Sequence, residues 1–82
     1  MPRVVVADAS CRDFTGDVTE FEVEAATVRE AIRALDRLYP GIGDHIERRM
    51  AIAIDGEIHQ DALFSPLGSC SEVYLIPKIG GG

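Results

Sequence analysis

The sequence predicts an α+β domain of two layers, in which a mixed sheet of four to five strands packs on one main helix. Three observations favour this class. Short β-branched or alternating segments lie near both ends and in the middle of the chain, one amphipathic helical segment spans residues 28–39, and turn signals separate them. Because one helix can cover only one face of a sheet, the opposite face is expected to be open.

The first two strands are expected to form a hairpin. Residues 3–7 are a β-branched run with the character of a buried strand. Residues 8–17 are polar, contain Gly16, and are interpreted as a long, irregular loop. Residues 18–25 alternate, with Phe21 and Val23 on one face and glutamates on the other.

The main helix begins at a capping box formed by Thr27 and Glu30 and ends at Pro40-Gly41. Its apolar stripe consists of Val28, Ala31, Ile32, Leu35, Leu38 and Tyr39. The outer face carries Arg29, Arg33 and Arg37, close to Glu30 and Asp36. We interpret it as a solvated face.

Residues 43–49 are expected to form a short second helix with Asp44 as a possible cap, followed by a strand over residues 50–54. Asp55-Gly56 predicts a tight reversal into residues 57–59. The turn-rich segment that follows carries three side chains expected to close the core: Leu63, Phe64 and Leu67.

The last strand is predicted over residues 72–76, parallel to the first strand in mid-sheet. The core would then contain Val4, Val6, Phe21, Val23, Ile52, Ile54, Val73 and Leu75. The open face would present Val5, Ala51, Ala53, Tyr74 and Ile76, which we expect, with Lys78, to dock a partner. The alternative is an antiparallel sheet with one moderately apolar face.

Length and charge limit the functional classes. Eighty-two residues support one domain, which we place at residues 1–77, with a flexible tail at residues 78–82. A net charge of −6 argues against a nucleic-acid partner and for partners with a basic surface. The sequence shows neither a cationic leader nor a membrane span, so we expect a cytoplasmic, soluble protein without a membrane partner.

The chain offers few groups for chemistry of its own. Cys11 and Cys70 lack metal-ligand spacing, so no metal site is expected, and they are interpreted as reduced loop thiols at opposite ends of the domain. His45 and His59 are expected to stand alone at the surface. No catalytic residues are assigned.

The chain ends on three glycines, Gly80, Gly81 and Gly82, directly after the last strand. Without Cβ atoms, such a tail could be threaded through a narrow channel that presents its carboxylate to a partner. The alternative is a loose end, since glycine-rich termini are flexible whatever their purpose.

The order of elements and the tail together resemble the β-grasp, ubiquitin-like sulfur carriers of the molybdopterin synthase small-subunit and thiamine-biosynthesis type. The segments that resemble the family are residues 12–16, 24–30, 53–57 and 72–82. The chain departs from the family where Gly68-Ser-Cys-Ser-Glu72 replaces Gly-Asp-Glu, and where Lys78 replaces a second proline. These departures leave the pathway open.

The resemblance implies that an E1-like adenylyltransferase, using ATP and magnesium, activates Gly82. A thiocarboxylate formed there would deliver sulfur to an acceptor enzyme such as a synthase. The chain itself would be a carrier that binds no cofactor, not an enzyme. Two alternatives remain: a ubiquitin-like modifier conjugated through Gly82, and a non-catalytic β-grasp adaptor such as a phage tail-assembly module.

Overall fold

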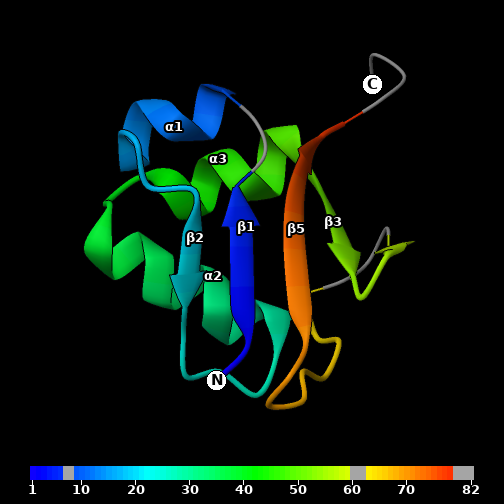
Figure 1. Ribbon diagram of the computed structural model, residues 1–82. Helices are drawn as coiled ribbons and strands as arrows, with labels where there is room; N and C mark the ends of the chain where they lie inside the picture. Colours follow the sequence, from blue (N-terminus) through cyan, green and yellow to red (C-terminus); the bar gives the residue numbers. More distant parts are fainter. Residues whose placement is uncertain (7–8, 60–62, 79–82) are drawn as a thin grey trace.

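Strands β1 (Arg3–Val6) and β5 (Glu72–Pro77) run parallel at the centre of the sheet in the computed structural model, which describes residues 1–6, 9–59 and 63–78 (Figure 1). Val4 lies beside Val73 and Val6 beside Leu75. All four side chains are buried, because both strands have neighbours on each side and α2 covers one face. The predicted parallel pair in mid-sheet is confirmed.

Three further strands complete a five-stranded sheet of order β2-β1-β5-β3-β4. Strand β3 (Met50–Ile54) is antiparallel to β5, and β4 (Glu57–His59) returns along β3. The reversal at Asp55 and Gly56 places both residues at positive φ, 49° and 88°, which is the geometry of a tight hairpin turn. The sheet is therefore mixed, as predicted.

Strand β2 (Glu20–Glu22) is shorter than the predicted segment of residues 18–25. Antiparallel contact with β1 nevertheless continues beyond both ends of β2. The Val6 amide donates to the Thr19 carbonyl at 2.8 Å, and the Val23 amide donates to the Pro2 carbonyl at 3.0 Å. The hairpin is confirmed, and only its regular central part qualifies as a strand.

Helix α2 (Val28–Leu38) crosses behind the sheet (Figure 1). The Glu30 amide donates to Thr27 Oγ1 at 3.3 Å, and a Glu30 carboxylate oxygen lies 3.5 Å from the Ala26 amide, which confirms the capping arrangement. Its buried residues are Val28, Ala31, Ile32 and Leu35. Leu38 is 63% exposed, so the prediction that it faces the core was wrong; the helix ends there and its last turn extends past the sheet.

Helix α3 (Ile42–Arg49) is capped by a residue that local sequence does not indicate. Asp36, in α2, accepts hydrogen bonds from the amides of Gly41 at 3.1 Å and Gly43 at 2.9 Å. A carboxylate at this end also interacts favourably with the helix dipole. Asp44, the predicted cap, lies inside the helix and pairs with Arg48, so that prediction was wrong.

Replacing Asp36 with alanine is expected to lower the free energy of unfolding by about 1 kcal/mol, the usual cost of losing a helix cap. Denaturant unfolding of Asp36→Ala would measure it. Asp44→Ala is the matched control, because it removes a carboxylate from the same helix end without touching the cap. An equal loss in both variants would refute the assignment of Asp36 as the cap.

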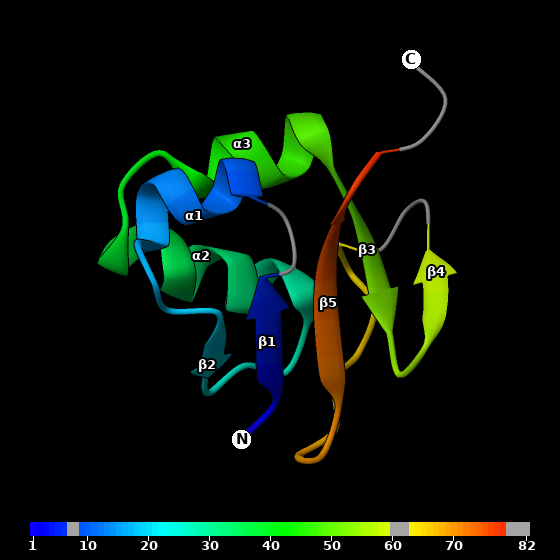
Figure 2. The same ribbon diagram turned by 45° about the horizontal axis from the view of Figure 1, so that its top comes forward.

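Residues 9–15 form a helix, α1 (Ala9–Thr15), where a loop was predicted. The helix buries Cys11 and Thr15 and half-buries Phe14, whose ring lies 5.5 Å from that of His45 in α3. Figure 2 shows α1 and α3 side by side at the end of the sheet towards which β1 and β5 run. The helix depends on this tertiary contact, since its sequence is mostly polar.

One core joins the sheet to the three helices. It comprises Val4, Val6, Cys11, Val23, Val28, Ala31, Ile32, Leu35, Ile42, Ile46, Met50, Ile52, Ile54, Leu67, Val73 and Leu75. Phe21 and Leu63 are partly buried against it. Phe64 is 73% exposed, so its predicted place in the core was wrong.

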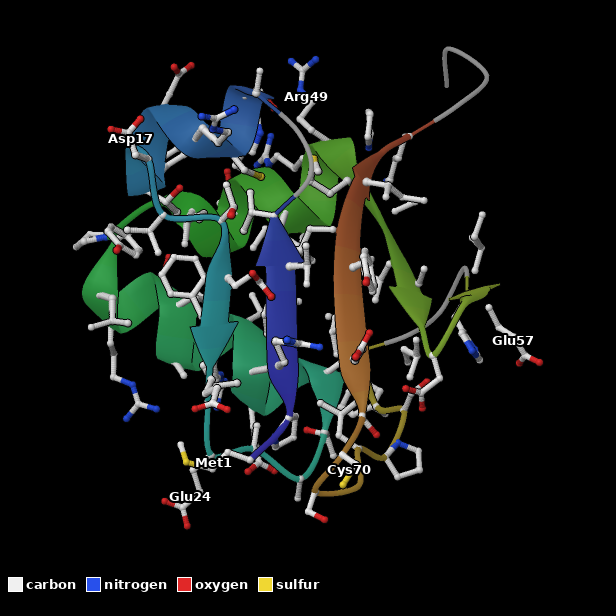
Figure 3. The ribbon with its side chains drawn as sticks, viewed as in Figure 1. Met1, Asp17, Glu24, Arg49, Glu57 and Cys70 are labelled. Atoms are coloured by element: carbon white, nitrogen blue, oxygen red, sulfur yellow. The ribbon has the colours of Figure 1, made fainter. Side chains whose placement is uncertain are left out.

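Cys11 and Cys70 lie at opposite ends of the domain, as predicted, and Figure 3 shows Cys70 in the turn before β5. Cys11 is buried in α1, so the prediction that it is a loop thiol was wrong, because the helix packs it into the core. Within the described part of the chain, no helix has the length and apolar character needed to cross a membrane.

Candidate docking face and exit of the C-terminal tail

Strand β5 leads the chain out of the sheet between its two neighbours. At the end of the strand Pro77 lies opposite Met50, and the Lys78 amide then donates to the Arg49 carbonyl at 3.2 Å. The Lys78 ammonium donates to the Glu47 carbonyl at 3.4 Å, in the last turn of α3. Both hydrogen bonds hold Lys78 against the C-terminal end of α3. Figure 2 shows the end of β5 beside this end of the helix.

Lys78 therefore has a structural contact as well as its predicted role in docking. Its cation lies where a helix C-terminus favours positive charge. Gly80, Gly81 and Gly82, the predicted threading and activation residues, lie outside the described residues. Their assignment remains a prediction.

The sheet face opposite α2 carries two apolar rows. One row crosses the sheet from Val5 through Tyr74 and Ala53 to Ile58, since each of these residues lies opposite the next. The second row, nearer the tail, pairs Ile76 with Ala51. Figure 1 shows this face turned towards the viewer, with no helix in front of it.

Ala53 contributes less to this face than expected. It is only 8% exposed, because its small side chain lies between the larger Tyr74 and Ile58. Ile58 is 62% exposed and was not among the predicted docking residues. The sequence could have predicted that Ile58 lies on this face. The two-residue turn at Asp55-Gly56 fixes the register of the hairpin and places Ile58 opposite Ala53.

Charged residues bound the apolar rows at the end of the sheet away from the tail. Arg3 pairs with Glu72 at 2.6 Å and with Glu20 at 3.2 Å. Tyr74 Oη donates to the second oxygen of Glu72 at 3.3 Å. The hydrogen bond to Glu72 and the charges of Glu72 and Glu20 raise the pKa of Arg3 above its usual value. Arg3 and Glu72 thus form an ionic group at the end of the face away from Ile76, and Glu20, opposite Val5, lies at its β2 edge.

The two histidines lie away from this face or at its margin. His45 is half-buried, and its Nε2 lies 2.9 Å from Ser10 Oγ, so the expectation that it stands alone at the surface was wrong. Packing of α1 on α3 causes this burial. His59, at the end of β4, lies 4.0 Å from a Glu57 carboxylate oxygen.

Replacing Ile76 with aspartate is expected to weaken docking of a partner protein on this face by about tenfold or more, because a charge would be buried in the contact. The fold should lose at most about 1 kcal/mol, since the side chain faces outward. Titration calorimetry and denaturant unfolding would measure the two effects. Leu38→Asp, at an exposed site on α2, is the control that should leave docking unchanged. Extensive unfolding of the Ile76 variant would contradict its placement.

Comparison with known proteins gives three results. The ThiS family model matches residues 9–82. A chain of the BexX/CysO complex of Amycolatopsis orientalis superposes with a TM-score of 0.84 at 20% identity, with all of both chains covered. No match is found among curated protein sequences.

Two further solved structures share the fold. The small archaeal modifier protein SAMP1 of Methanosarcina acetivorans gives a TM-score of 0.80 at 22% identity, covering 99% of this chain and 95% of its own. A chain from the complex of molybdopterin-converting factor subunits of Helicobacter pylori gives 0.67 at 22% identity, covering 99% and 97%. At these identities the structures establish the β-grasp fold.

Proposed function

The chain belongs to the ThiS family of ubiquitin-like sulfur carriers, and from that premise we propose that it carries sulfur as a thiocarboxylate on Gly82. One structural observation supports the proposal most directly. The central strand β5 ends beside an apolar sheet face, and the base of the tail is held at Lys78. A partner that docks on the face therefore receives the tail from a defined position.

The chemistry requires activation, because a carboxylate is a poor electrophile. An E1-like adenylyltransferase would join the Gly82 carboxylate to AMP from magnesium-bound ATP and release pyrophosphate. The terminal sulfur of a partner persulfide, as the nucleophilic anion, would then attack the carbonyl carbon, and AMP would leave with the bonding electron pair.

The acyl disulfide formed in this step still joins the carrier to its sulfur donor. A thiol of the partner would reduce the sulfur–sulfur bond, forming a new disulfide and leaving the thiocarboxylate on Gly82. Delivery of that sulfur to an acceptor enzyme would complete the cycle. This chain supplies the carrier group, and the partners supply the catalytic groups and the ATP site.

Solved structures of similar proteins support the proposal that this chain acts with protein partners. Two of the similar chains were determined in complexes, one with BexX and one with the other subunit of molybdopterin-converting factor. We propose that the apolar rows around Tyr74 and Ile76 dock first the activating enzyme and later the acceptor. Alternating use of one face would keep the two steps in order.

A protein modifier is the second candidate, favoured by the likeness to SAMP1. In that case a target lysine would attack activated Gly82 and form an isopeptide bond. Lys78 is the sole lysine of the chain, and its ammonium is bound to the Glu47 carbonyl. Polymeric chains through this side chain are therefore disfavoured, whereas single attachment to other proteins is not.

Mass spectrometry of protein isolated from its own cells would distinguish the candidates. A glutamate-specific protease cutting after Glu72 releases residues 73–82, which contain neither methionine nor cysteine. Oxidation of sulfur side chains therefore cannot imitate replacement of oxygen by sulfur in this peptide. Sulfur on Gly82 would support the carrier, an isopeptide would support the modifier, and an unmodified peptide throughout would favour the adaptor.

A further inference from the structure

The outer face of α2 carries three arginines on successive turns, Arg29, Arg33 and Arg37, which we call the arginine row. All three are exposed. Residues four apart in a helix are separated by about 6 Å along its axis, so the guanidinium groups form a regular series. The row faces away from the sheet, because the opposite side of α2 packs on the core.

The carboxylates beside the row are engaged elsewhere. Asp36 accepts two amides at the start of α3. Glu30 closes the capping box, with one oxygen 3.5 Å from the Ala26 amide and the other 3.4 Å from Thr27 Oγ1. Among the residues that the structure describes, no ion pair involves a member of the arginine row. In the described ranges, a protein of net charge −6 thus keeps three successive cations without carboxylate partners.

An aromatic ring lies at one end of the row. The Arg29 guanidinium carbon lies 5.7 Å from the centroid of the Phe64 ring, and Phe64 is 73% exposed. Leu38 is also exposed, but as the residue after Arg37 it lies about 100° further round the helix and does not belong to the face of the row. A large exposed aromatic side chain next to these cations suits a surface that is both acidic and apolar.

These observations identify the class of partner. Guanidinium groups match carboxylates in geometry, and the adjacent Phe64 ring offers an apolar contact to a protein partner. The net charge disfavours a nucleic acid, which would be repelled by the rest of the surface. We propose that α2 binds an acidic amphipathic helix of a partner protein through the arginine row and Phe64.

The surface formed by the arginine row and Phe64 lies where a partner could bind without covering the open sheet face. Helix α2 and the open face lie on opposite sides of the sheet (Figure 1). A partner on α2 therefore leaves the apolar rows accessible. The protein could remain attached to one partner while a second acts on its C-terminus. The proposed contact itself stands on the helix face alone and does not depend on sulfur chemistry.

An NMR titration of the full chain tests the proposal. The probe is a synthetic helical peptide in which glutamate recurs every fourth residue between leucines, with a lysine-for-glutamate version as negative control. We expect shifts of backbone amides along α2 and of arginine Nε–H groups in the row, weakening as salt is added. The lysine peptide should cause none.

Two triple variants separate the local contact from overall charge. R29Q/R33Q/R37Q should reduce peptide affinity about tenfold, in line with the loss of three exposed ion pairs. R12Q/R48Q/R49Q changes net charge equally and should reduce affinity less than about threefold. Ile76→Asp should bind the peptide normally, since the sheet face is not involved.

Three results would overturn the proposal: shifts centred on the sheet face, equal losses in both triple variants, or no shifts at low salt. Sedimentation in the same buffer provides a further check. Self-association that disappears in R29Q/R33Q/R37Q would assign the surface to a second copy of the chain and not to an acidic partner.

Discussion

Adding one alanine after Gly82 is expected to abolish adenylation without affecting the fold. The extra residue would move the carboxylate by up to about 3.6 Å and place a Cβ where glycine is expected to pass. ATP–pyrophosphate exchange with a purified E1-like enzyme would measure the loss, which should reach the background rate. An alanine placed before Met1 is the matched control and should be activated normally.

Gly81→Val separates the shape of the tail from its length. The variant retains the terminal carboxylate at its original distance but adds a branched side chain. We expect an equally complete loss of exchange if the tail passes a narrow channel. A wild-type rate would refute threading, while loss in the alanine-extended chain alone would leave only the requirement for a correctly placed carboxylate.

Leu75→Ala is expected to cause the largest loss of stability. Leu75 is fully buried in the central strand, so truncation removes apolar contacts and leaves a cavity that costs about 2–5 kcal/mol. Small domains are often stable by only about 5–15 kcal/mol, so much of the stability would disappear. Denaturant midpoints would measure the change.

Ile76→Ala provides a control at the next position of the same strand. Its side chain is only half-buried and points to the open face. The free energy of unfolding should fall by less than about 1 kcal/mol, a smaller loss than for Leu75. Equal losses in the two variants would contradict the assignment of the two faces of β5.

Alternation along the chain predicted the sheet well because side chains in a strand point to opposite faces in turn. The inward positions of Val73 and Leu75 and the outward positions of Tyr74 and Ile76 all follow from it. The neighbour Ile58 was missed at the candidate site, although the preceding turn fixes its register. Recognition of the open face thus depended on pairing as well as periodicity.

Two of the errors in the helical part have a common origin in tertiary structure. Helix α1 has a polar sequence, and it is held by packing of Phe14 on His45, which lies far along the chain. Likewise, the cap of α3 comes from Asp36 in the preceding helix and not from Asp44 nearby. Local sequence patterns do not show which side chain from a distant segment will pack on a helix or cap it.

The central position of β5 also bears on how the protein is made. Arg3 and Glu72, joined across the central pair, are 69 residues apart, so nearly the whole chain must be available before the middle of the sheet can close. During synthesis β5 emerges after the other four strands of the sheet. A prematurely terminated chain would lack both the tail and the strand that separates β1 from β3. Incomplete chains should therefore fail to fold and should not be recognised by a partner protein.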